Sequence, residues 1–210
     1  GFDSVPSDLG VFFAANSVDG ELKSVRGFHA WKGEASGGTM ETMFSSIDAK
    51  SAKGGLGKFS LNPKNSVSDF QKKNTSDKIK VEKISGLSGW TGPFIMALPN
   101  TRVVRRSAAL SKNIGKYYGD SFVYSEGAYY SRRGAALKVS FMTMLIGLII
   151  LSPLRKIARP LFRKPGQGPS QKAMDEGFFK SRFLVETTSG QRAFMMSASG
   201  DPGYKMTSRM

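Results

Sequence analysis

The longest apolar run of the chain, residues 139–151, most narrowly limits what the chain can fold into. It contains thirteen residues, with Lys138 before it and Ser152-Pro153 after it. As a helix the run would extend about 20 Å, whereas the hydrocarbon core of a membrane is about 30 Å thick. We therefore expect a helix that lies on a membrane or lipid surface without spanning it. The alternative is a helix buried in a protein core.

A basic segment follows and is predicted to form an amphipathic helix over residues 154–164. Ser152 and Pro153 suit its cap and first position, and Pro160 should kink it. A short apolar helix beside a basic one is typical of an interfacial anchor, and the alternative is a core helix with a solvated basic partner. The predicted membrane-associating segment, residues 139–164, would use Phe141, Leu145, Leu148, Ile149, Leu151, Arg155, Lys156 and Arg159.

Charge and composition exclude several kinds of site. The formal net charge is +15, and residues 101–210 hold 19 Lys and Arg against 6 Asp and Glu. Such a basic half attracts a polyanion, which can be an anionic membrane, a phosphorylated cofactor or nucleic acid. We expect no nucleic-acid partner because no nucleic-acid-binding motif is present. The chain has no cysteine and a single histidine, His29, in a strand-like run, so we expect no metal site and a structural histidine.

The first ten residues carry the chemistry of a helix start. Asp3 or Ser4 can supply a capping oxygen, Pro6 tolerates the first turn, and Asp8 places negative charge near the positive helix end. A helix over residues 4–15 is therefore predicted.

The remaining pattern predicts an α+β fold with a mixed or antiparallel sheet. Residues 49–83 are rich in Lys, Gly, Ser and Asn and are predicted to be a surface insertion. The predicted strands are 22–31, 122–130, 182–186 and 192–196, the last two forming a hairpin at Ser189-Gly190, and helices are predicted from Met40 to Ile47 and after Tyr204.

Six short segments, in order along nearly the whole chain, resemble the saccharopine dehydrogenase-like oxidoreductases, a family that includes the trans-acting enoyl reductases. The resemblance implies that residues 1–15 cross from a Rossmann domain, whose glycine-rich cofactor turn would precede Gly1, into an α+β substrate-side domain, residues 16–210. The chain would then be an internal fragment, truncated at both ends. The six segments are Gly1–Gly10, Ser36–Thr39, Val103–Ser107, Phe122–Glu126, Gly168–Ser170 and Gly200–Tyr204.

The resemblance also implies an activity and a set of site residues. The intact protein would be an NAD(P)-dependent oxidoreductase that reduces a lipid-linked substrate, with the cofactor held mainly by the missing domain and not by this fragment alone. The nicotinamide side would involve Gly1, Phe2, Asp3 and Ser4, and the substrate or anion side Ser36, Gly37, Gly38 and Thr39. A glycine-led helix start has free N–H groups for an anion, although it can equally be a plain helix entry.

Further expectations concern anions, protons and location. Arg105 and Arg106 are predicted to clamp an anionic ligand, the alternative being a solvated basic face. Tyr124, Tyr129 and Lys138 are chemically possible proton donors. The resemblance implies association with a mitochondrial membrane or a lipid droplet, with a cytoplasmic location as the alternative, and a homodimer is possible. The rival function is a non-catalytic membrane or lipid-droplet scaffold.

Overall fold

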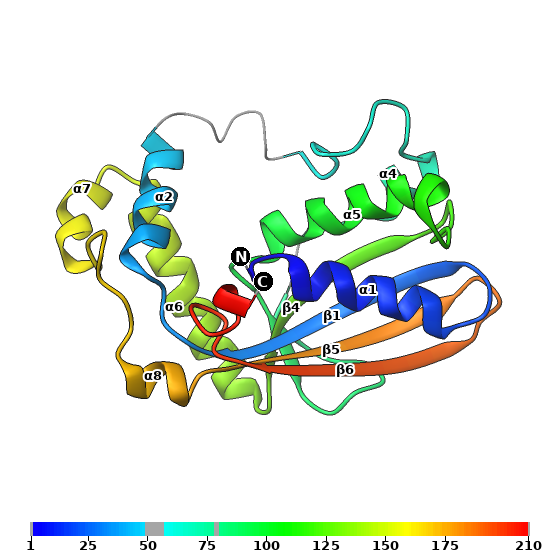
Figure 1. The fold of residues 1–210 in the computed structure, drawn as a ribbon. Helices are drawn as coiled ribbons and strands as arrows, with labels where there is room; N and C mark the ends of the chain where they lie inside the picture. The colour runs from blue at the N-terminus through cyan, green and yellow to red at the C-terminus, as the bar shows by residue number, and fades with distance from the viewer. Residues whose placement is uncertain (1, 49–56, 78–79, 210) are drawn as a thin grey trace.

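The structure, a computed structural model, describes residues 2–48, 57–77 and 80–209. The fold is α+β, as predicted, and its centre is a mixed six-stranded sheet in the order β2-β3-β4-β1-β5-β6 (Figure 1). β1 and β4 are parallel, and every other neighbouring pair is antiparallel. The strands are β1 (Leu22–Lys32), β2 (Glu82–Lys83), β3 (Trp90–Gly92), β4 (Val123–Tyr130), β5 (Phe178–Thr187) and β6 (Arg192–Gly200).

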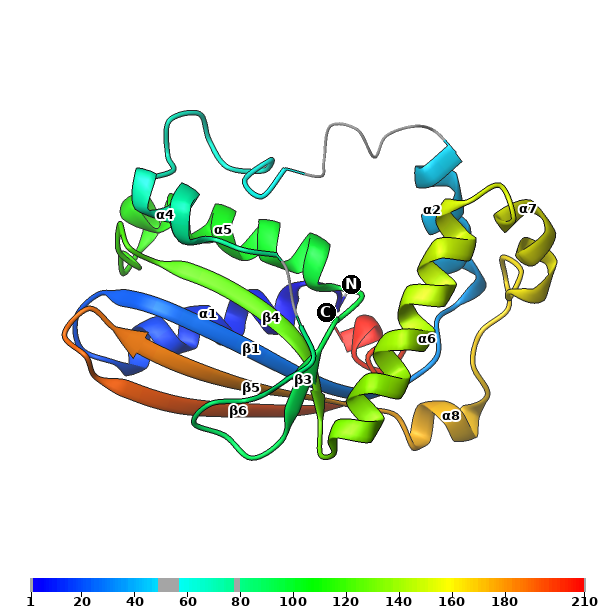
Figure 2. The same ribbon diagram turned by 180° about the vertical axis from the view of Figure 1, so that it is seen from behind.

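Helices cover the sheet and extend from one end of it. α1 and α5 pack on each other and on the sheet, whereas α2, α6, α7 and α8 gather at the end away from the β5–β6 turn (Figures 1 and 2). The described helices are α1 (Val5–Ser17), α2 (Gly37–Asp48), α4 (Asp69–Asn74), α5 (Ala97–Ile114), α6 (Arg133–Leu151), α7 (Arg155–Ala158), α8 (Gln171–Asp175) and the 3-10 turns η1 (Arg159–Leu161) and η2 (Thr207–Arg209).

The main core lies between α1, α5 and the sheet. Val11 of α1, Val104 of α5 and Phe183 of β5 are all fully buried in it. Gly10 allows the close approach of α1 to β5, because a Cβ atom there would lie 2.3 Å from Cζ of Phe183. Gly10, the last residue of the Gly1–Gly10 segment, is therefore needed for this close packing.

Local patterns predicted several elements correctly. The opening helix, the strand of residues 22–31, the strand before Tyr130 and the C-terminal hairpin are all present, and Gly190 in the hairpin turn has a φ of +84°. Ser4 lies at the N-cap of α1, but its hydroxyl donates a hydrogen bond to Asn100 instead of capping the helix. After Tyr204 the chain forms turns and η2 rather than an α-helix, although Asp201 accepts the N–H groups of Tyr204 and Lys205 as a helix cap would.

α5 was not predicted, although it is one of the two longest helices described. Pro99 in its first turn and the β-branched pair Val103-Val104 weaken the local helix signal. Burial of Val104 and Ala108 against the sheet outweighs that weakness. Part of the expected surface insertion is also ordered, since α4 and β2 lie within it; residues 49–56 lie outside the described chain.

α6 is longer than the apolar run predicted. It begins at Arg133 and has 19 residues, or about 28 Å at about 1.5 Å per residue. By length and composition, residues 133–150 could cross a membrane, so the expectation of a helix too short to span one is wrong. Charged residues at its start do not end a helix, because they lie exposed at the helix surface. Ala136 is buried where α6 packs on β3 and β4.

The basic amphipathic helix is shorter than predicted. α7 has only four residues and continues as η1, because Pro160 has no N–H group to extend the α-helical pattern. Ser152 accepts the N–H of Leu154, as a cap would.

Candidate functional site

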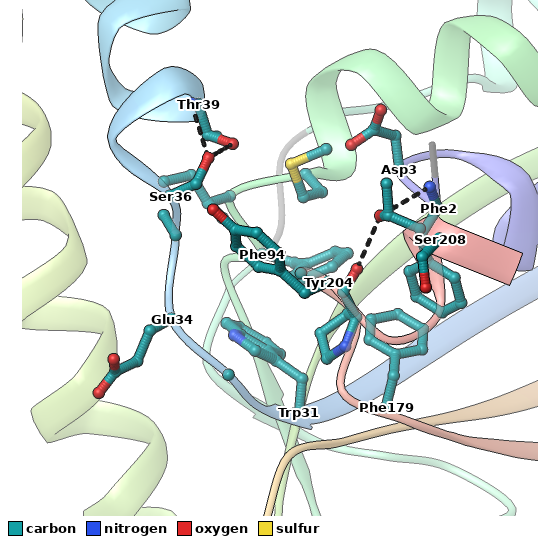
Figure 3. A pocket seen from close by; sticks show the side chains of 17 residues that line it. Phe2, Asp3, Trp31, Glu34, Ser36, Thr39, Phe94, Phe179, Tyr204 and Ser208 are labelled. Carbon is teal, nitrogen blue, oxygen red and sulfur yellow. Dashed lines mark hydrogen bonds between the residues drawn. The ribbon is translucent and has the colours of Figure 1, made fainter. Parts of the chain in front are cut away.

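The largest described cavity lies where the start of α1, the end of β1, the start of α2 and the C-terminal turn meet. Its volume is about 560 Å³. Aromatic side chains from distant parts of the chain line it, and Figure 3 shows Phe2, Trp31, Phe94, Phe179 and Tyr204 around the same space. The cavity therefore exists only once the two ends of the chain have come together.

Ring packing holds the aromatic wall in place. Phe2 meets Phe179 edge to face at 5.1 Å between ring centroids, and Trp31 meets Phe94 at 4.9 Å. The N–H of Phe2 also donates to Oγ1 of Thr207, 3.4 Å away. Trp31 remains 38% exposed, so part of its indole ring faces the open cavity.

The polar edge of the cavity comes from the start of α2. The Thr39 N–H donates to Oγ of Ser36 (3.1 Å), so Ser36 caps the helix whose first turn borders the cavity. The charged lining residues are Asp3 and Glu34, and none of the described lining residues is a Lys or Arg. The helix start favours an anion, the Asp3 carboxylate opposes one, and Glu34 is paired with Arg163, so these effects offset one another and the cavity suits a neutral group.

The C-terminal turn closes the cavity from the other side. Asp201 is buried and accepts the N–H of Tyr204 at 2.7 Å, which presents Gly203 and Tyr204 to the cavity. Gly168 lies against Tyr204, since a Cβ atom on Gly168 would be 2.8 Å from the tyrosine oxygen. The Gly168–Ser170 segment thus supports the Gly200–Tyr204 segment from behind.

The structure places the predicted site residues in two groups. Phe2, Asp3, Ser36 and Thr39 line the cavity together, whereas Arg105 and Arg106 of α5 do not line it. Gly1 lies outside the described residues.

Arg105 is not a solvated arginine. It is 4% exposed and donates to Oδ1 of Asp77 (2.8 Å) and to the carbonyl oxygens of Lys58 and Tyr124. Burial acts to raise the pKa of Asp77, but the hydrogen bonds and charges of Arg105 and Arg102 outweigh it and hold that pKa below its ordinary value. Arg106 points elsewhere and donates to the carbonyl oxygen of Leu61. The alternative of a solvated basic face is therefore wrong for Arg105, and the anion clamp by Arg105 and Arg106 stays a prediction.

A buried polar network behind the aromatic wall was not predicted. Its centre is Glu126, which is 1% exposed. Oε2 of Glu126 accepts hydrogen bonds from Ser7 Oγ (2.8 Å) and Tyr124 Oη (2.6 Å), and Oε1 accepts one from Asn100 Nδ2 (2.7 Å). Asn100 in turn accepts the hydroxyl of Ser4. The network therefore ties β4 and α5 to the first turn of α1, next to the residues that enter the cavity.

His29 completes this network and is structural, as its strand context predicted. Its Nε2 lies 3.2 Å from Oε2 of Glu126 and its Nδ1 lies 2.9 Å from Oγ of Ser181. An ionised Glu126 only accepts hydrogen bonds, so the Nε2–H tautomer of His29 fits this contact. The ring stacks on Phe179, with Phe94 5.0 Å away, so the network supports the back of the aromatic wall.

The three expected proton donors lie away from the cavity. Tyr124 is fully buried, and burial together with the neighbouring Glu126 charge raises its pKa well above the ordinary value. The ring of Tyr129 lies under Arg182, and Lys138 is exposed on α6. Tyr204, the last residue of the Gly200–Tyr204 segment, is the described tyrosine that does line the cavity, although the resemblance assigned it no role. Within the described ranges, no group of three or more His, Asp or Glu side chains is placed to hold a metal ion.

The predicted membrane residues lie largely on the surface. Phe141, Leu145 and Leu148 are each at least 41% exposed, although they are large and apolar. Ile149 is half-buried, and the side chain of Leu151 lies outside what the structure describes. Arg155, Lys156 and Arg159 follow in α7 and η1.

The protein is an α+β domain whose main cavity has aromatic walls and no Lys or Arg among its described lining residues. Comparison with known proteins points to one named group. Over 99% of its length, the chain is 34% identical to a Mycobacterium tuberculosis protein provisionally named trans-acting enoyl reductase. It is 30% identical over the same share to the trans-acting enoyl reductases of Mycobacterium ulcerans and Mycobacterium bovis. The chain spans 54% of the length of each of these relatives. No protein-family profile and no solved structure matches it.

Proposed function

We propose that this chain is the substrate-side half of an NAD(P)H-dependent enoyl reductase of the saccharopine dehydrogenase-like kind, which reduces a carbon–carbon double bond of a lipid-linked substrate at a membrane or lipid-droplet surface. The names of the relatives support a reductase. The observation that carries the proposal is the convergence of separate segments on one cavity. Phe2 and Asp3 of the first segment, Ser36 and Thr39 of the second, and Pro202, Gly203 and Tyr204 of the last line it, and Gly168 lies against Tyr204.

The cavity fits one end of the cofactor only. Flat aromatic walls and a polar edge suit the uncharged amide ring of a nicotinamide, with Phe2 and Asp3 on one side and Trp31 and Phe94 on the other. A diphosphate carries two negative charges, and none of the described lining residues is a Lys or Arg that could neutralise them, while the Asp3 carboxylate opposes the anion-favouring start of α2. The diphosphate would therefore be held by residues outside this chain. When bound, the reduced cofactor supplies the hydride.

The side chains of this chain would orient the substrate and exclude water. The apolar walls formed by Phe94, Ile95 and Phe179 suit an acyl or isoprenoid chain, and a closed aromatic wall keeps water from the reacting carbon atoms. Reduction of an enoyl group also needs a proton on the carbon next to the carbonyl group. Tyr204 is our candidate donor, because it is the tyrosine among the described lining residues and a phenol can act as a general acid.

The experiment uses Trp31 as a reporter of the cavity. The chain has two tryptophans, so Trp90→Phe leaves Trp31 as the single one. Titration of that variant with a medium-chain enoyl thioester should quench or shift the Trp31 fluorescence. Thr39→Phe, which fills the cavity edge, should remove the binding, whereas Thr42→Phe on the same helix serves as the matched control because Thr42 does not line the cavity.

The reductase activity is tested with the longer protein that contains this chain. We expect oxidation of NADH or NADPH that depends on the enoyl substrate, with a saturated product by mass spectrometry, and a strong loss of turnover in Tyr204→Phe. Binding to vesicles together with no oxidation of either cofactor across a series of enoyl substrates would refute the enzyme and favour the membrane or lipid-droplet scaffold.

A further inference from the structure

A second cavity lies on the other side of α2 from the candidate site. It has a volume of about 320 Å³ and is enclosed by α2 and by the segment that runs from α7 through η1 to Pro165. The two cavities share no lining residue, but α2 contributes residues to both and therefore forms a wall of each. In Figures 1 and 2 this region forms the outer end of the molecule, next to the end of α6.

The second cavity is strongly basic. Its lining contains four cations, Lys156, Arg159, Arg163 and Lys164, and one carboxylate, Glu41. Arg159 pairs with Glu41, and Arg163 pairs with Glu34 outside the cavity. Nζ of Lys156 and Nζ of Lys164 have no side-chain partner among the residues that the structure describes. Two lysines therefore keep their full attraction for an anion at this cavity.

The basic segment is packed firmly against α2 and is not a loose loop. A Cβ atom on Gly37 would lie 1.7 Å from the carbonyl oxygen of Lys164, so only glycine allows this contact. The Gly37 N–H donates to the carbonyl oxygen of Gln167 (2.9 Å), and Arg163 donates to that of Ala35 (3.1 Å). Phe162 meets Phe44 edge to face at 5.4 Å. Both contacts of Gly37 therefore involve the Ser36–Thr39 segment of the resemblance.

We propose that this cavity binds the phosphate group of an anionic lipid headgroup. Phosphate matches converging lysine and arginine side chains. A lipid, rather than a soluble phosphate, fits the apolar side chains beside the cavity, since Leu154 is 56%, Ile157 77% and Leu161 87% exposed. A lipid surface would cover these side chains and the exposed face of α6, whereas a soluble anion would cover neither. The inference rests on the membrane association proposed above and does not depend on reductase activity.

The site predicts which lysines matter. In flotation with vesicles of phosphatidylcholine and phosphatidylglycerol, Lys156→Gln/Lys164→Gln should weaken binding about fivefold per lysine and about thirtyfold in total. The matched control, Lys64→Gln/Lys73→Gln, removes the same charge from exposed lysines near α4, at the opposite end of the molecule (Figure 1). The control should bind nearly as the unaltered chain does. Thermal melting of both variants checks that each is folded.

Each outcome decides the inference. Preference for anionic vesicles, lost in the cavity variant and kept in the control, supports it. Equal binding of the unaltered chain to pure phosphatidylcholine vesicles leaves membrane association in place and overturns the headgroup site, as does an equal loss in both variants. Binding to neither kind of vesicle overturns membrane association and the headgroup site together. Release from vesicles by micromolar glycerol 3-phosphate would assign the cavity to a soluble phosphate instead.

Discussion

Tyr124→Phe removes one hydroxyl group from the buried network around Glu126 and leaves the aromatic ring in place. Oη of Tyr124 donates to Oε2 of Glu126 at 2.6 Å, and both residues are 1% exposed. A hydrogen bond to a charged group typically contributes about 1.5–3 kcal/mol. Glu126 keeps its bonds from Ser7 and Asn100, so no charge is left without a partner. We expect the free energy of unfolding to fall by about 2 kcal/mol.

A pH dependence accompanies this loss. The pKa of Tyr124 is raised in the folded state, first by burial and then by the Glu126 charge. Its contribution to stability is therefore complete below the unfolded-state pKa of about 10 and is lost as the pH rises from there through the folded-state value. Tyr124→Phe should remove that alkaline loss, of about 1.4 kcal/mol per pH unit, and flatten the stability curve above about pH 10.

Urea denaturation across neutral and alkaline pH measures both effects. In thermal denaturation at neutral pH, the melting temperature should fall by about 4–8 °C, given about 2–4 °C per kcal/mol for a chain of this size. Tyr204→Phe is the control, because Tyr204 is 40% exposed and lies outside the network, and it should leave stability nearly unchanged. A Tyr124→Phe variant as stable as the unaltered chain, with the same alkaline slope, would refute the network as a stabilising unit.

The remaining predictions concern α5 and α1. Arg105→Gln should lower the free energy of unfolding by about 1.5–3 kcal/mol, because it removes a hydrogen bond between charged groups while Asp77 keeps its pair with Arg102. Arg106→Gln should cost under about 1 kcal/mol. Urea titration of the two variants side by side tests this, and equal small losses would contradict it. The pKa of Asp77 is lowered, so its contribution to stability is present above its unfolded-state pKa and is lost as the pH falls through the folded-state value. Asp77→Asn should therefore reduce the loss of stability at acid pH. An unchanged dependence of stability on acid pH would count against the ion pair. Gly10→Ala should destabilise the chain by about 1–3 kcal/mol by forcing α1 away from β5, and a melting temperature equal to that of the unaltered chain would show that the helix can shift freely.

The six segments of the resemblance have physical roles that differ from one another. Some line the first cavity, and others meet inside the core, where Arg105 of the Val103–Ser107 segment donates to the carbonyl oxygen of Tyr124 in the Phe122–Glu126 segment. A chain of this kind therefore needs several segments for packing alone. Gly10 and Gly37 show this most directly, because each permits a close approach between elements that a side chain would block.

Local sequence determined the elements whose signals lie within a few residues. Alternation predicted β4, apolar residues mixed with polar ones after Asp19-Gly20 predicted β1, and turn chemistry predicted the β5–β6 hairpin at Gly190. The opening helix followed from its start signals. These patterns predict structure well because they depend on residues close in the chain. The sheet then buries the apolar faces that the patterns indicated.

Only the tertiary structure decided the rest. α6 begins at Arg133, where it packs against β3 and β4, rather than where the apolar run begins, and α5 forms because the sheet buries one of its faces. The role of Arg105 depends on Asp77, 28 positions away, and the network joins Ser7 to Glu126 across 119 positions. Burial and pairing are properties of neighbours in space, so a local pattern that marks Arg105 as a cation cannot show that it lies in the core.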